Sequence, residues 1–258
     1  PLVPIDRSGH KNWNTTARIN RDKAQAALED LDVVFLGDSI TEGWKGTSLG
    51  NLVGKKKDNP AVYDKYFTMK GGGDIEALPL GISGDTSPNL LWRLQNGELP
   101  ANLHPAVFWV LIGTNDLGVS WCAPELVLIG ILRVVEELLE KRPAATIVIN
   151  GIFPLAFDKR GYVNRPESRN HARRGQRLRP PVWKSVEAIN DQLRRYSKKH
   201  DRVVYFETNK FFVDPDAEDN DLQLNSEFMY DSLHFNSKGY ELWAKEIVKT
   251  LKPILDNR

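Results

Sequence analysis

The chain has 258 residues, of which 41% are hydrophobic and 27% charged, and its net charge is +1. This composition is ordinary for a globular protein and provides no global field that would attract nucleic acid or an anionic membrane. No apolar run reaches the roughly 18–20 residues that a membrane-spanning helix needs, and a single cysteine, Cys122, excludes an intramolecular disulfide and a cysteine-based zinc site.

Apolar runs rich in β-branched residues alternate with helical patterns along the chain. Each run is short and bounded by Gly, Pro or charge, as is typical of buried parallel strands; the runs are 32–37, 77–82, 106–113, 146–151 and 202–207. Apolar residues recur with the helical period in 124–141, 182–199 and 237–251. The alternation predicts one α/β domain over residues 1–258, with a mostly parallel sheet and helices on both faces.

Three stretches interrupt this alternation. We expect loops at 54–60 and 71–74, which are rich in lysine and glycine. The basic segment, residues 159–184, holds nine Lys and Arg residues against one acid, Glu167, and indicates a loop insertion at about 159–182. Long loops in compact domains tend to be functional.

The basic segment has two interpretations. The simpler one is a solvated surface loop. The alternative is a rim or lid that attracts an anionic substrate, with Arg173, Arg174, Arg177 and Arg179 supplying the charge.

Small polar residues stand where the predicted strands end. Ser39 follows the first strand, Gly84 the second and Asn115 the third, while Asp231 and His234 precede the last predicted helix. In an open α/β sheet, ligands bind at the carboxyl ends of the strands, so these residues are the candidates for a site.

These residue types match the parts of an acyl-transfer site. A serine hydroxyl becomes a nucleophile when a histidine takes its proton, and a carboxylate orients that histidine. The oxyanion that forms needs preorganised N–H donors, which a backbone amide at a glycine or an Asn side chain can supply.

Four sequence blocks carry a family resemblance: GDSITE (37–42), GISGD (81–85), GTND (113–116) and DSLH (231–234). In this order they resemble the blocks of the SGNH/GDSL hydrolases. A narrower match, GISGDTSPNLLWRLQNGEL followed by VFWVLIGTND, resembles the catalytic subunits of platelet-activating-factor acetylhydrolase IB, a branch of that superfamily.

The resemblance implies a flavodoxin-like three-layer α/β/α sandwich and a serine esterase that uses no metal and no cofactor. By this resemblance Ser39 is the nucleophile, His234 the general base and Asp231 its orienting carboxylate. Gly84 and Asn115 are the oxyanion-hole donors, together with the backbone N–H of Ser39.

Structural interpretations compete with these roles. Ser39 and Glu42 have the spacing of a capping box at a helix N-terminus, and Glu42 could cap the turn that presents Ser39. Asp38 is expected to form hydrogen bonds within the turn, and Ser83 is expected to be a turn residue. Asp116 is left without a role.

Tryptophans are the remaining candidates for substrate contact. Trp44 and Trp92 are assigned to the substrate site, together with Arg173 and Arg174, and Trp121 is a further candidate. Packing in the core is the commoner fate of tryptophan. For Cys122, which follows Trp121, we expect packing as a small hydrophobic residue.

The leading hypothesis is an esterase that removes a short acyl group, acetyl above all, from a small-molecule, lipid or carbohydrate ester. A lysophospholipase or a thioesterase of the same fold is the alternative within the enzyme class. A nucleic-acid-binding module is disfavoured by the near-zero net charge. A catalytically silent interaction subunit is the third hypothesis, because relatives of the acetylhydrolase branch pair with themselves and with other proteins, but the intact Ser, Gly, Asn, Asp and His set argues against it. Pairing with a second copy stays open.

The cellular compartment also stays open. The lone cysteine weakly favours a reducing compartment such as the cytoplasm. The sequence starts at Pro1 rather than Met, however, so the earlier removal of a signal peptide remains an alternative.

Overall fold

The computed structural model describes residues 3–27, 31–157, 160–166, 179–214 and 222–256. Its strands are β1 (Val33–Gly37), β2 (Thr47–Ser48), β3 (Asn51–Leu52), β4 (Ala77–Gly81), β5 (Val107–Leu111), β6 (Thr146–Asn150) and β7 (Val203–Phe206). Its helices are α1 (Lys11–Gln25), α2 (Ser39–Glu42), α3 (Asn59–Phe67), α4 (Ser87–Arg93), α5 (Thr114–Gly118), α6 (Pro124–Lys141), α7 (Trp183–Ser197), α8 (Asn209–Phe212) and α9 (Ser237–Leu255).

The central sheet has five parallel strands in the order β4-β1-β5-β6-β7. Numbered along the chain within this sheet, the order is 2-1-3-4-5, which is the flavodoxin-like arrangement. All five strands lie within the apolar runs identified in the sequence, so the predicted α/β fold with a parallel sheet is confirmed. β1 lies between β4 and β5, and this is the position at which the strand order reverses.

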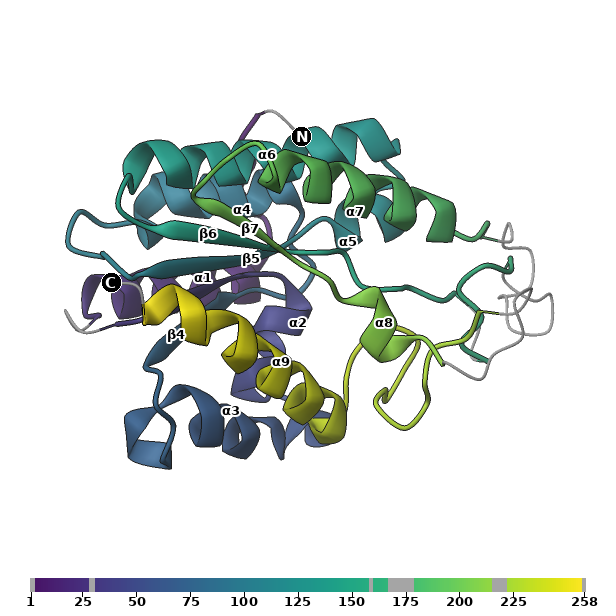
Figure 1. Cartoon of the computed structure of the whole chain (residues 1–258), viewed down its shortest axis with the longest axis horizontal. Coiled ribbons are helices and arrows are strands. Elements are labelled where there is room, and N and C mark those ends of the chain that lie inside the picture. The colour runs from purple at the N-terminus through teal and green to yellow at the C-terminus, as the bar shows by residue number, and fades with distance from the viewer. Residues whose placement is uncertain (1–2, 28–30, 158–159, 167–178, 215–221, 257–258) are drawn as a thin grey trace.

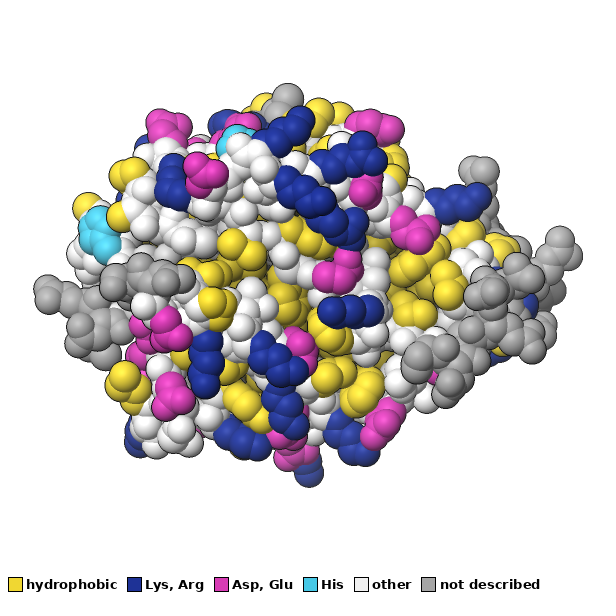
Figure 2. Space-filling model, viewed as in Figure 1, with side chains coloured by type: hydrophobic (Ala, Val, Ile, Leu, Met, Phe, Trp, Pro, Cys, Tyr) yellow, Lys and Arg dark blue, Asp and Glu magenta, His cyan; other side chains and the backbone are white. Residues whose placement is uncertain are grey.

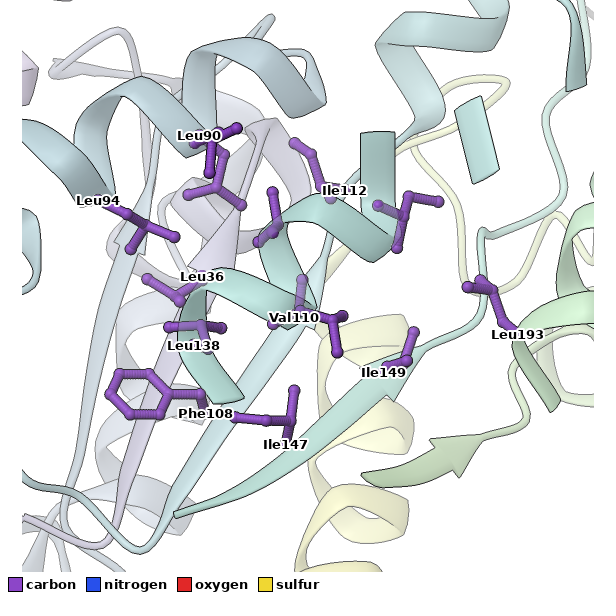
Figure 3. Close-up of a cluster of buried hydrophobic side chains, with 14 of the residues drawn as sticks. Leu36, Leu90, Leu94, Phe108, Val110, Ile112, Leu138, Ile147, Ile149 and Leu193 are labelled. Atoms are coloured by element: carbon purple, nitrogen blue, oxygen red, sulfur yellow. The ribbon is translucent and has the colours of Figure 1, made fainter. Parts of the chain in front are cut away.

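Helices cover both faces of this sheet (Figure 1). One hydrophobic cluster packs the side chains of α4, α6 and α7 against the sheet, and the other packs those of α3 and α9 against its opposite face. Figure 3 shows part of the first cluster, which includes Leu36, Val110 and Ile149 of three neighbouring strands and Leu138 of α6. The three-layer sandwich is therefore built as predicted.

Helices α1, α3 and α4 are among those that lie outside the predicted ranges. α1 buries Trp13, Thr16, Asn20 and Ala24, and because two of these are polar, its buried face has no apolar periodicity to detect. α3 starts at Asn59 with a proline at the next position, which suits the first turn of a helix. The loop prediction for 54–60 is therefore wrong for residues 59 and 60, which belong to α3. α4 starts after Thr86, whose side chain forms a capping box with Asn89.

The surface mixes charges of both signs. On the face that Figure 2 shows, basic and acidic side chains are interspersed, as the net charge of +1 leads one to expect. In the part of the chain that the structure describes, no helix has the length and apolar character needed to cross a membrane. Of the basic segment, residues 160–166 and 179–184 are described. Arg173, Arg174 and Arg177 lie outside the described residues, so their predicted role stays a prediction.

Candidate active site

Three of the predicted site residues meet at the carboxyl edge of the sheet. Ser39 starts α2 two residues after β1 ends, Gly84 lies three residues beyond β4, and Asn115 lies in α5 just beyond β5. These are the three adjacent strands at the reversal of strand order. An open parallel sheet binds its ligands at this position.

Asp38, and not Ser39, caps helix α2. The Asp38 side chain accepts a hydrogen bond from the backbone N–H of Ile40 at 3.0 Å, which confirms its expected role within the turn. The Ser39 hydroxyl is consequently not occupied as a cap. Ser39 is 8% exposed, so its side chain is nearly buried yet still reaches the surface of the site.

A chain of hydrogen bonds joins the predicted triad. The Oγ of Ser39 lies 2.9 Å from Nε2 of His234, and Nδ1 of His234 lies 2.9 Å from Oδ2 of Asp231. Ser39 is 195 positions from His234 in the sequence, whereas Asp231 is only three positions from it. This geometry is that of a serine activated by a histidine and a carboxylate.

Asp231 is held as an ionised acceptor. Partial burial opposes its ionisation, but the hydrogen bonds from the ring and the backbone N–H of His234 and from the N–H of Leu233 outweigh burial, so its pKa is lowered. In a serine–histidine–carboxylate triad, a negative carboxylate stabilises the imidazolium that forms when the histidine accepts a proton.

The loop that carries His234 is fixed on both sides. The N–H of Tyr230 donates to the carbonyl of His234 at 3.0 Å, and the Tyr230 ring stacks on the imidazole with the two planes 9° apart. Directly after the loop, the Asn236 side chain caps α9 by accepting from the N–H of Gly239. The imidazole is thus oriented by its ring contacts as well as by Asp231.

The predicted oxyanion-hole donors are the backbone N–H groups of Ser39 and Gly84 and the side-chain amide of Asn115. Among the described residues, no acceptor is found for the backbone N–H of Ser39 or of Gly84. Gly84 has a φ of +81°, a conformation that side chains disfavour, and a Cβ there would lie 3.1 Å from the Arg7 guanidinium. The Asn115 Nδ2 donates to the Asp85 carbonyl at 2.9 Å and more weakly to Oδ2 of Asp38 at 3.4 Å. Both amide hydrogens of Asn115 therefore have protein acceptors, and a substrate oxygen would have to replace the longer contact, the one with Asp38.

Glu42 does not form the predicted capping box. Its buried carboxylate accepts from the N–H and hydroxyl of Ser83, both at 2.7 Å, and from the N–H groups of Leu49 and Gly50. Burial opposes its charge, but these hydrogen bonds outweigh burial and lower the pKa of Glu42. Glu42 therefore ties the turn after β4 to the turn after β2, and Ser83 is the structural turn residue expected.

Asp116, which had no predicted role, braces α4. Its carboxylate accepts from the backbone N–H and the hydroxyl of Ser87, the latter at 2.6 Å. This contact fixes the start of α4 against the helix that carries Asn115.

Two pockets flank Asp231 and Ser232. The first has a volume of about 380 Å³ and is mainly apolar beyond His234, with Val119, Leu155 and Phe157 on its wall and Arg179 at its side. The second, of about 450 Å³, has Lys55 and Arg160 on its lining together with Met229 and Tyr230. The first pocket is also lined by Asn115 and His234, whereas the second borders the triad only at Asp231.

The tryptophans assigned to substrate contact do not lie at the site. Trp44 is fully buried and stacks on Trp243 with ring centroids 5.0 Å apart, so that prediction is wrong because core packing encloses the ring. Trp92 packs against Trp13 and lines a separate pocket that contains none of the triad residues. Trp121 is 47% exposed and contacts Phe157 of the first pocket.

A buried charge cluster behind Gly84 was missed in the sequence. The fully buried Asp85 accepts from the Arg93 Nε at 2.8 Å, the Trp13 Nε1 at 2.6 Å and the Arg7 guanidinium at 3.2 Å. Asp85 belongs to the GISGD block, so an acidic residue next to Gly84, the predicted oxyanion-hole glycine, was the available signal. Arg93 lies within the longer GISGDTSPNLLWRLQNGEL match, whereas Arg7 and Trp13 lie near the N-terminus, outside every quoted block.

The comparisons with known proteins identify the family. The model of the GDSL-like lipase/acylhydrolase family matches residues 35–242. The human platelet-activating factor acetylhydrolase IB subunit alpha1 is 30% identical over 93% of this chain and 83% of its own length. The human alpha2 subunit is 26% identical over 99% of this chain and 90% of its own length.

Solved structures share the fold. A GDSL-like lipase from Bacteroides thetaiotaomicron superposes with a TM-score of 0.65 at 21% identity, covering 94% of this chain and 98% of that one. A carbohydrate esterase family 3 protein from Talaromyces cellulolyticus gives a TM-score of 0.55 at 17% identity, covering 88% of this chain and 99% of that one.

We expect the buried Asp38 to make stability depend on pH. Burial raises the pKa of Asp38 from 3.8 to about 7, with the charges of Asp85 and Asp116 adding to it and that of His234 opposing. A carboxyl with a raised pKa stabilises the fold fully below its unfolded-state pKa, and this contribution is lost as pH rises towards about 7. Asp38→Asn cannot ionise, so relative to the parent it should gain about 2 kcal/mol of unfolding free energy between pH 5 and pH 8.

Denaturant unfolding of both proteins at the two pH values measures this gain. A difference between variant and parent that does not change with pH would contradict a raised pKa for Asp38.

Proposed function

Because the chain belongs to the GDSL-like lipase/acylhydrolase family and is a carboxylic ester hydrolase, we propose that it hydrolyses short-chain esters, above all acetyl esters, through an acyl-enzyme on Ser39. The observation that carries this proposal is the hydrogen-bonded chain from Ser39 through His234 to Asp231. These hydrogen bonds lie at the edge of the sheet where Gly84 and Asn115 are also located.

In the first half of the proposed reaction, Ser39 Oγ attacks the carbonyl carbon of the ester while His234 Nε2 takes the hydroxyl proton. The carbonyl oxygen becomes an oxyanion and accepts from the N–H groups of Ser39 and Gly84 and from Nδ2 of Asn115. The tetrahedral intermediate then collapses, the bond to the alcohol oxygen breaks, and the leaving alcohol takes the proton from His234. Ser39 is left acylated.

In the second half, water replaces the alcohol. His234 takes a proton from the water as its oxygen attacks the acyl carbon, and the same three donors bind the oxyanion. Collapse breaks the bond to Ser39 Oγ, which regains its proton from His234, and the carboxylic acid leaves. Asp231 stays ionised throughout and stabilises the transient imidazolium.

The preference for acetyl rests on the relatives. The curated relatives that cover most of this chain are named as subunits of an acetylhydrolase that acts on platelet-activating factor. One observation favours the alternative of a longer acyl group: the apolar pocket beside His234, with a volume of about 380 Å³, has room for more than a methyl group.

Basic side chains near the triad support an ester with an anionic group. Arg179 lines the first pocket, and Lys55 and Arg160 line the second. Arg160 and Arg179 come from the two described ends of the basic segment. We therefore extend the anionic-substrate hypothesis for this segment to a phosphate or carboxylate on the alcohol side of the ester.

We expect Ser39→Ala to remove hydrolysis of p-nitrophenyl acetate, with a loss of roughly 10³-fold or more in kcat, because no nucleophile remains. Circular dichroism and the melting temperature should match the parent, since Ser39 contributes little packing. Ser197→Ala, at the last residue of α7, is the matched control and should keep its activity. Turnover by folded Ser39→Ala at the parental rate would refute the nucleophile assignment.

A chain-length series of p-nitrophenyl esters, from acetate to dodecanoate, tests the acyl preference. If acetyl is the substrate group, kcat/KM is highest for acetate and falls by on the order of 10-fold or more for the longest chains. A maximum at eight carbons or more would overturn the acetyl proposal and favour the lysophospholipase or thioesterase alternative.

The Arg179 side chain should discriminate between charged and neutral esters. The matched substrates are 4-acetoxybenzoate, which is anionic, and 4-acetoxybenzamide, which is neutral. Arg179→Gln should raise KM for the anionic ester by about 5-fold or more, as expected for a lost charge-assisted contact, and leave the neutral one unchanged. Arg133→Gln, on the exposed side of α6, is the control. An equal change for both esters would argue against an anionic substrate.

A further inference from the structure

The segment before the first strand reaches into the turn that carries Gly84. Arg7 donates to the backbone carbonyl of Ser83 at 3.0 Å and to the Asp85 carboxylate at 3.2 Å, and Trp13 of α1 donates from its indole N–H to the same carboxylate oxygen at 2.6 Å. Both residues precede residue 35, where the match to the family model begins. The contacts are therefore made by a part of this chain that the family model does not cover.

Asp85 is the residue through which these contacts reach the two candidate donors. Its backbone follows Gly84 directly, and its carbonyl accepts from Nδ2 of Asn115 at 2.9 Å. One hydrogen of the Asn115 amide is thereby fixed, and the direction of the other follows from the planar geometry of the amide. A displacement of Asp85 would move Gly84 and rotate Asn115 together.

The Asp85 carboxylate is fully buried, so it is stable only if it is fully paired. Arg93, itself buried, donates to Oδ2 at 2.8 Å and also to the carbonyls of Gly37 and Leu80, which ties Asp85 to the ends of β1 and β4. The other oxygen, Oδ1, accepts hydrogen bonds only from Trp13 and Arg7 among the described residues. Without them, a buried acceptor next to Gly84 would have no partner.

We propose that Arg7 and Trp13 are positioning residues: by pairing with Asp85, they hold Gly84 and Asn115 in the geometry that an oxyanion requires. This inference rests on the proposed function for the role of the two donors. It adds that the N-terminal segment is part of the support of the active site, because donors must be held within roughly 0.5 Å of their productive positions.

Kinetics of Trp13→Phe and Arg7→Gln test the positioning role. Trp13→Phe keeps an aromatic ring against Trp92 but lacks the N–H, while Arg7→Gln removes the guanidinium from a side chain that is 25% exposed. For p-nitrophenyl acetate, we expect kcat to fall by about 10-fold and KM to change by less than about 2-fold, since the loss is confined to the transition state. The affinity for a trifluoromethyl ketone, whose tetrahedral adduct carries an oxyanion, should fall by the same factor.

The control is Arg18→Gln, an exposed residue of the same helix, which should behave as the parent in both measurements. Arg7→Lys retains a charge and should recover part of the lost kcat. If Trp13→Phe does not fold, Arg7→Gln decides alone. A folded Arg7→Gln with parental kcat, or with a lower kcat and unchanged ketone affinity, would overturn the proposal.

A spectroscopic measurement separates this inference from the proposed function. The side-chain amide signal of Asn115 in a ¹H–¹⁵N spectrum, identified by its absence in Asn115→Asp, should shift in Trp13→Phe and Arg7→Gln but not in Arg18→Gln. This shift depends on the contact through Asp85 and not on any substrate. If the signal does not move, the positioning role is wrong, even where Ser39 is shown to be the nucleophile.

Discussion

Parallel pairing of β1 with both β4 and β5 is the constraint on which the whole site depends. Because the three strands run in one direction, their carboxyl ends meet at one edge, and the residues that follow them are brought together although they lie far apart in the sequence. Ser39, Gly84 and Asn115 each follow one of these ends. Only His234 and Asp231 arrive from elsewhere, on the loop that leads into α9.

Buried carboxylates then fix the turn after β4, which carries Ser83 and Gly84. Glu42 binds the Ser83 turn from one side, and Asp85, paired with Arg93, holds it from the other. Buried carboxylates are costly unless they are fully hydrogen bonded, so these two specify one arrangement of the turn more than they add to stability. Among the described residues, the N–H of Gly84 has no acceptor.

The sequence alone was enough to predict the parallel sheet and to name the residues of the triad in their order along the chain. Buried parallel strands are short continuous apolar runs, and all five were visible for that reason. Elements that pack through polar side chains could not be predicted from the sequence. The helix α1 was missed because Thr16 and Asn20 lie on its buried face. The spacing of Ser39 and Glu42 fits a capping box, but the partners of Glu42 are distant turns that local spacing does not reveal.

The central claim is that Ser39 is the residue that forms a covalent bond with the acyl group. A fluorophosphonate, which reacts with an activated serine, can be added to the active protein and the modified residue located by peptide mapping with mass spectrometry. The account predicts one modification, on the peptide that contains Ser39, with loss of esterase activity in proportion to labelling. Full inactivation with the modification on another residue, or full labelling of Ser39 with activity retained, would contradict it.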